Sequence, residues 1–171
     1  MSAKKDKIIW LEDKPELNKE IVSLFNNEQA NIILCKDLAS FSEVTIKEAN
    51  DPETSIKGFI LDILIHGAES LDDLNLPHIT TPLGFDTGYM VLLEYIRNMD
   101  GDSPLGDKWK DSPVLMLTTL DQALISDRYK RYIDDETQKN KNLTKWLSKA
   151  DDHGNQDYCL NEIKEWLKSI P

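Results

Sequence analysis

The stretch that decides the fold is Gly58-Phe59-Ile60-Leu61-Asp62, an apolar run that ends in a carboxylate. Three other apolar runs also end in polar residues: residues 8–11 in Glu12-Asp13, residues 114–117 in Thr118, and residues 143–148 in Lys149. If these runs are parallel strands, their C-terminal ends share one edge of a sheet, where open α/β sheets bind their ligands. The sequence therefore predicts three carboxylates, a hydroxyl and an ammonium group at one edge.

Segments with helical spacing of apolar residues lie between the apolar runs. We expect strands at residues 8–11, 31–34, 56–65, 114–117 and 143–148, and helices at residues 15–25, 41–50, 89–97, 121–138 and 160–170. Five β/α units in succession predict an α/β fold with a five-stranded parallel sheet and helices on both faces. Residues 1–171 fit a single domain, and an inserted loop at about residues 66–86 interrupts the alternation.

The composition excludes several classes of function. The chain has 171 residues and a formal net charge of −11, whereas nucleic-acid binding depends on basic patches that neutralise phosphates. No apolar run approaches the roughly 18 residues that span a bilayer, and the first residues lack the apolar core of a signal peptide. Cys35 and Cys159 are too few for a disulfide framework or a cysteine zinc site. We therefore expect a cytoplasmic protein that binds neither nucleic acid nor membrane.

The predicted edge has the chemistry of a magnesium-assisted phosphoryl transfer onto an aspartate. Mg²⁺ prefers oxygen ligands and keeps several waters, so Glu12, Asp13 and Asp62 suffice as ligands. Lys149 adds a point charge suited to a phosphoryl oxygen, and Thr118 adds a hydroxyl donor. In this hypothesis Asp62 is the nucleophile. Taken singly, such residues have a plainer explanation, because an acidic residue after a strand usually caps the following helix.

These residues resemble those of response-regulator receiver domains, the CheY-like family of two-component signalling. Residues 8–13 are similar to the family's first strand with its acidic pair, and Phe59-Ile60-Leu61-Asp62 to the strand with the phosphoacceptor. Leu115-Met116-Leu117-Thr118 resembles the strand that ends in the switch residue. Lys149 matches the invariant lysine, Gly88 the glycine that opens the third helix, and Trp146 the aromatic switch residue. The resemblance covers residue 8 to about residue 167 and implies a doubly wound sheet of strand order 2-1-3-4-5.

The resemblance also implies a function. A histidine kinase or phosphotransfer protein would donate a phosphoryl group to Asp62 with Mg²⁺ present, and the chain would be a phosphoacceptor rather than an enzyme. Thr118 would then move towards the phosphoryl group and Trp146 would repack, which would change the affinity for an unknown downstream protein. We expect a stand-alone receiver, because the stretch after Lys149 has room for one helix. Formation of a homodimer stays open.

Several positions depart from the family pattern. Ala150 follows Lys149 where the family usually has proline. Leu64 and Leu120 match positions that in the family influence hydrolysis of the acyl phosphate, and two apolar side chains there predict a phosphoryl state that lasts for hours. Residues 66–86 make the loop after the phosphoacceptor longer than in the family, and long loops tend to be functional or disordered. A lid, a partner-docking element and a passive surface excursion all remain open for this insertion.

Two other functions compete with this prediction. A receiver-like module that binds partners independently of phosphorylation is the closest alternative, although the complete set of site residues argues against it. A phosphohydrolase of the haloacid dehalogenase type would need a second aspartate two residues after the nucleophile, where this chain has Leu64. Nucleotide binding is not indicated, since the chain has neither a P-loop nor a GxGxxG motif.

The sequence does not indicate a transition-metal site. The three histidines, His66, His78 and His153, share no metal-ligand spacing, so we expect them to be surface residues.

Overall fold

The computed structural model describes residues 6–14, 22–23, 31–118, 134, 136, 138, 143–149 and 156–171. Their main sheet consists of five parallel strands: β1 (Lys7–Leu11), β2 (Asn31–Cys35), β3 (Ile56–Asp62), β6 (Val114–Thr118) and β7 (Thr144–Ser148). The strand order across the sheet is β2-β1-β3-β6-β7. Counted along the chain within this sheet, that order is 2-1-3-4-5, so the predicted topology is confirmed.

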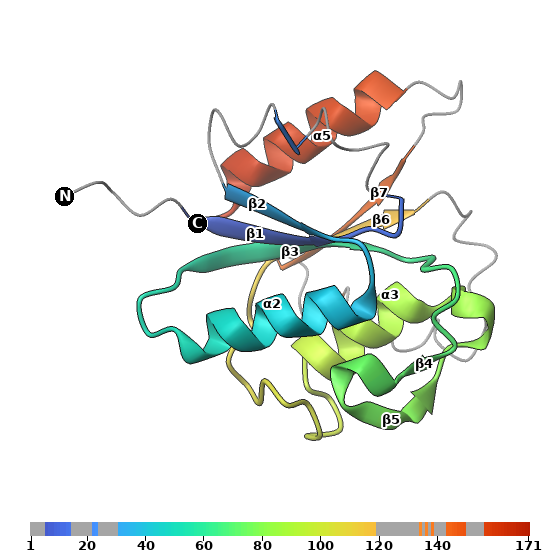
Figure 1. Ribbon diagram of the computed structural model, residues 1–171. Coiled ribbons are helices and arrows are strands. Elements are labelled where there is room, and N and C mark those ends of the chain that lie inside the picture. Colours follow the sequence, from blue (N-terminus) through green and yellow to red (C-terminus); the bar gives the residue numbers. More distant parts are fainter. Residues whose placement is uncertain are drawn as a thin grey trace.

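Helices cover both faces of the sheet (Figure 1). On one face lie α2 (Leu38–Asn50) and α3 (Thr87–Met90), which continues as a π-helix over Val91–Ile96, and on the other lies α5 (Gln156–Ser169). In the parts of the chain that the structure describes, no helix is long and apolar enough to cross a membrane.

Alternate residues of each strand pack into two separate cores. Ile9 and Phe59 belong to the core beneath α2 and α3, whereas Ile8 and Ile60 belong to the core beneath α5. Successive strand residues point to opposite faces of a sheet, and here both faces are covered. This explains why the strands are apolar throughout instead of alternating between apolar and polar residues.

Some boundaries differ from those that the sequence predicts. β3 ends at Asp62 and not at residue 65, because Ile63 and Ile65 leave the sheet and are buried in the core beyond its edge. α2 begins earlier than predicted, because the Asp37 side chain accepts a hydrogen bond from the Ser40 backbone N–H at 2.8 Å and caps the helix. The helices predicted at residues 15–25 and 121–138 lie largely outside the described residues.

The segment between β3 and α3 has secondary structure of its own. It contains β4 (Ser70–Leu71), a 3₁₀ turn (Asp72–Leu74), β5 (Leu76–Thr80) and a tight turn at Pro82–Gly84, and β4 pairs with β5 in antiparallel fashion. Figure 1 shows it packed at the ends of α2 and α3. Besides Ile63 and Ile65, its side chains buried in the core shared with α2 and α3 are Leu71, Leu74, Leu76 and Ile79. The segment is therefore part of the hydrophobic core.

A buried ion pair holds the opposite end of the α3 helix. The Arg97 guanidinium donates from Nε to Glu136 Oε1 at 2.7 Å and from Nη2 to Thr144 Oγ1 at 2.9 Å, and Nη1 donates to the carbonyls of Lys110 and Ser112. Thr144 is the first residue of β7. The network thus fixes the start of the strand that leads to Lys149.

The beginning of α3 lies directly against the end of β3. The Gly88 N–H donates to the Ile63 carbonyl at 2.9 Å, and a Cβ atom on Gly88 would lie 2.2 Å from the Asp62 carbonyl oxygen. Backbone atoms cannot move aside as a flexible side chain can. Only glycine fits this position, which sets the spacing between the helix and the strand that carries Asp62.

We predict that Gly88→Ala lowers the free energy of unfolding by about 3 kcal/mol, because the added methyl group overpacks a backbone contact. Gly106→Ala is the control: a Cβ there meets nothing within 4 Å and its φ is +55°. That variant should cost about 1 kcal/mol through backbone strain alone. Urea denaturation measures both, and equal losses would contradict the steric explanation.

Candidate functional site

The structure brings three carboxylates together at the C-terminal edge of the sheet. Glu12 and Asp13 follow β1, and Asp62 is the last residue of the adjacent strand β3. Leu11 pairs with Leu61 in the register of these strands, so the residues that follow them are neighbours. One ligand oxygen from each carboxylate lies within 4.8 Å of the other two. Glu12 is 1% exposed and Asp62 is 5% exposed, whereas Asp13 is half-buried.

Lys149 follows β7, the edge strand of the sheet, and its side chain bridges two of these carboxylates. Its Nζ donates to Glu12 Oε2 at 2.8 Å and to Asp62 Oδ2 at 2.7 Å. Burial alone would lower the pKa of Lys149, but the charges of Asp62 and Glu12 outweigh burial and raise the pKa above its ordinary value. The side chain is therefore an ammonium ion at neutral pH, and it partly neutralises the cluster.

Asp62 ionises less readily than an ordinary aspartate. Burial raises the pKa of its carboxyl to about 7, Lys149 opposes the increase, and the negative charge of Glu12 adds to it. Desolvation and a like charge both disfavour the ionised form. Added positive charge at this edge would stabilise the ionised form, which is the nucleophilic one.

Asp13 is held by a residue from the segment after β3. The His66 backbone N–H donates to Asp13 Oδ2 at 2.9 Å, and His66 Nδ1 lies 2.5 Å from the same oxygen. Although partial burial raises the pKa of Asp13, these interactions with His66 prevail and lower it. The sequence predicts His66 as a surface residue, and its side chain is 57% exposed. The sequence analysis does not predict its contact with Asp13. Its position four residues after Asp62 is the one feature of the sequence that indicates a place near the site.

The two predicted switch residues lie on β6 and β7. Leu117 pairs with Asp62 and its carbonyl accepts a hydrogen bond from the Ile63 N–H at 3.1 Å, so the backbone of Thr118 reaches the same edge. The side chain of Thr118 lies outside what the structure describes. Trp146 is half-buried and packs against Tyr89 of α3, with ring centroids 5.2 Å apart. The sequence did not identify Tyr89 as this partner.

The donor set fits a divalent cation. When all groups are ionised, the three carboxylates and the single ammonium leave two uncompensated negative charges. Carboxylate oxygens are the ligands that Mg²⁺ prefers, and two or three of them suffice beside water. Glu12, Asp13 and Asp62 are the residues that would hold such an ion.

Comparison with known structures identifies the fold. The chemotaxis response regulator CheY4 of Vibrio cholerae superposes with a TM-score of 0.50 at 15% identity, over 95% of this chain and 99% of that chain. A CheY-like receiver domain protein from Methanospirillum hungatei JF-1 gives 0.50 at 13% identity, over 96% and 95%. The signal receiver domain of an HD domain-containing protein from Pseudomonas fluorescens Pf-5 gives 0.51 at 10% identity, over 98% and 90%.

These similarities define the class of fold: the chain has the fold of response-regulator receiver domains over nearly its whole length. No protein-family model and no curated protein match the sequence. The fold resemblance seen in the sequence is thus confirmed.

We predict that Asp62→Asn stabilises the protein at pH 8, in the presence of EDTA, by about 2 kcal/mol. The pKa of Asp62 is about 7 in the folded state and 3.8 ordinarily. Because the folded protein retains a proton that the unfolded chain releases, the wild type loses stability as the pH rises from about 4 to 7. The asparagine variant carries no such charge.

Urea denaturation of both proteins at pH 5 and pH 8 tests this prediction. The advantage of Asp62→Asn should be smaller at pH 5 than at pH 8. A variant that is less stable than the wild type at pH 8 would show that the Lys149 ion pair outweighs the burial of the charge.

Proposed function

We propose that the protein is a phosphorylatable receiver of two-component signalling, in which Asp62 accepts a phosphoryl group from a histidine kinase or a phosphotransfer protein. The observation that carries the proposal is Lys149, which contacts both Glu12 and Asp62 within 2.8 Å at the edge where receivers of this fold class hold their site. The receiver fold supports the proposal, and so does the cluster of three carboxylates.

In the proposed reaction an oxygen of the Asp62 carboxylate attacks the phosphorus atom of a phosphohistidine. An O–P bond forms while the P–N bond breaks, and the imidazole nitrogen leaves with the electron pair and takes up a proton. The product is an acyl phosphate on Asp62. A carboxylate nucleophile divides phosphoryl transfer between two proteins into separate steps.

Each surrounding residue has a defined role in this proposal. A bound Mg²⁺ would neutralise charge on the transferred group, and Glu12, Asp13 and Asp62 would be its ligands. Lys149 would release Asp62 Oδ2 and donate to a phosphoryl oxygen, because the phosphoryl group carries the greater negative charge. His66 would keep Asp13 oriented through the two contacts to Oδ2.

The consequence for signalling would be a change in protein contacts. Movement of Lys149 and of Thr118 towards the phosphoryl group would alter the end of β6 and β7, and Trp146 lies on β7 against Tyr89. A local change in charge would thereby bias two arrangements of the Trp146 ring. The surface near β7 would then bind a downstream protein with altered affinity.

The direct test is intact mass after incubation with acetyl phosphate and Mg²⁺. The wild type should gain one phosphoryl group, and the gain should disappear in Asp62→Asn or when EDTA is added. Asp86→Asn is the control, because Asp86 is another partly buried carboxyl with a raised pKa, outside the cluster of three. It should be phosphorylated like the wild type.

A folded wild-type protein that gains no mass, from acetyl phosphate or from a phosphohistidine donor, would contradict the proposal. The receiver-like module that binds partners without phosphorylation would then be the better account.

We also predict that the acyl phosphate persists for hours. Leu64 is half-buried two residues after Asp62 and offers the attacking water no hydrogen bond. Leu64→Asn should shorten the half-life about tenfold, since one hydrogen bond contributes roughly 1.4 kcal/mol in the transition state. Leu64→Ala should not, because it removes bulk without adding a donor. Phosphorylated protein is followed by mass after removal of the donor, and a wild-type half-life of minutes would contradict the prediction.

A further inference from the structure

Two large apolar side chains are exposed two positions apart in the segment after β3. Leu83 is 68% exposed and Phe85 is 48% exposed, and they flank the buried Gly84. The remaining large exposed apolar residue of the described chain is Met99, at 48%. Single exposed apolar residues are ordinary on protein surfaces, whereas exposed apolar residues that gather in one place mark interaction sites.

The backbone at Leu83 is strained. The Gly84 N–H donates to the Thr81 carbonyl at 2.9 Å and closes a four-residue turn, in which Leu83 has φ 56° and ψ 14°. This left-handed conformation at the third position of a turn is normally occupied by glycine or asparagine. Leucine there is explained neither by backbone preference nor by burial. An unexplained outlier of this kind is evidence for a role in function.

The turn is fixed to the chain that leaves the site. The Ile65 N–H donates to the Gly84 carbonyl at 3.1 Å, and a Cβ on Gly84 would lie 1.9 Å from the Ile65 carbonyl oxygen. The Thr81 N–H also donates to the Glu69 carbonyl at 2.9 Å. Leu83 and Phe85 are thus presented from a backbone packed against the residues that follow Asp62. Such preorganisation reduces the entropy lost on binding.

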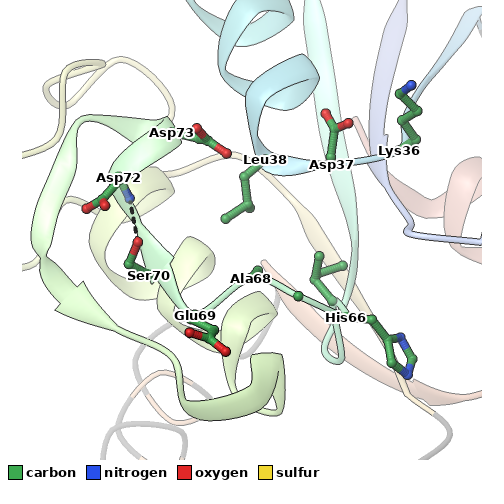
Figure 2. Close-up of a pocket in the computed structure, with 11 residues that line it drawn as sticks. Lys36, Asp37, Leu38, His66, Ala68, Glu69, Ser70, Asp72 and Asp73 are labelled. Carbon is green, nitrogen blue, oxygen red and sulfur yellow. Dashed lines mark hydrogen bonds between the residues drawn. The ribbon is translucent and has the colours of Figure 1, made fainter.

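The segment that carries these two residues is acidic. Residues 66–86 contain four acidic residues and neither lysine nor arginine. A hollow of about 270 Å³ lies between the start of α2 and residues 65–73, and the residues that line it include Asp37, Glu69, Asp72 and Asp73 against Lys36 as the one lysine (Figure 2). Ile65 and Glu69 also line it, and their backbones are hydrogen-bonded to Gly84 and Thr81 of the turn. Small-molecule pockets usually exceed roughly 300 Å³, so a basic side chain of a partner fits this hollow better than a free ligand.

We propose that Leu83, Phe85 and this acidic hollow form a docking surface for another protein, which presents an apolar patch bordered by lysine or arginine side chains. A second copy of the chain is disfavoured, because like charges would face each other. An anionic membrane surface is disfavoured for the same reason. The surface adjoins the residues that follow Asp62, so a bound partner would cover the rim of the candidate site. The proposal does not depend on phosphorylation of Asp62.

The test uses two fluorescent amphipathic peptides of equal length, one of leucine and lysine and one of leucine and glutamate. Fluorescence anisotropy should show binding of the lysine peptide and none of the glutamate peptide. Leu83→Gly, Phe85→Ser and Asp73→Lys should each weaken binding by about tenfold, as expected for residues at the centre of an interface. Met99→Ser and Asp111→Lys are the matched controls, since both residues are exposed at a distance along the chain, and they should bind like the wild type.

Absence of binding to the wild type, or equal binding by all variants, would overturn the proposal. If all variants bound the lysine peptide equally, the interaction would be nonspecific attraction of a basic peptide to a chain of net charge −11.

Leu83→Gly provides a second readout that a purely structural role would not give. Because glycine tolerates the left-handed conformation, this variant should have a melting temperature equal to or above that of the wild type while it loses peptide binding. A lower melting temperature would mean that Leu83 serves the fold, and would overturn the assignment.

Discussion

The ammonium group of Lys149 lies between two buried carboxylates that the sheet forces together. β1 and β3 are neighbours in register, so Glu12 and Asp62 must meet at their ends. Two buried carboxylates with no counter-charge would cost several kcal/mol. Lys149 supplies one positive charge from the residue after β7, and burial together with the remaining negative charge of Glu12 explains the raised pKa of Asp62. The same excess of negative charge makes the edge suited to a divalent cation.

The rest of the described structure holds this edge in place. Gly88 lets α3 approach the end of β3, and the Arg97 network fixes the start of β7. The segment after β3 contributes buried side chains to the core and holds Asp13 through His66. Its deletion would therefore expose core residues and disturb a carboxylate of the site, so point variants of its exposed residues are the better probes of its role.

The sequence predicts the sheet and the acidic edge well, because both depend on local patterns. Apolar runs that end in Asp62, Glu12-Asp13 and Lys149 require only that the strands be parallel and adjacent. The contacts of His66 with Asp13 and of Trp146 with Tyr89 join residues far apart in sequence, and no periodicity signals such pairs. The secondary structure of the segment after β3 is not predicted, because its prolines and acidic residues interrupt the apolar pattern and the buried positions Leu74, Leu76 and Ile79 follow no regular period. The left-handed backbone at Leu83 runs against the preference of leucine, so no propensity could have predicted it.

The measurement that tests the central claim most directly is a crystal structure of the protein with Mg²⁺ and beryllofluoride, which mimics a phosphoryl group on a carboxylate. We expect beryllium bonded to an oxygen of Asp62, the cation bound by Glu12, Asp13 and Asp62, and Lys149 in contact with a fluorine instead of the Asp62 oxygen. Beryllofluoride at another residue, or a site in which Lys149 keeps both of its contacts and no cation binds, would contradict the account.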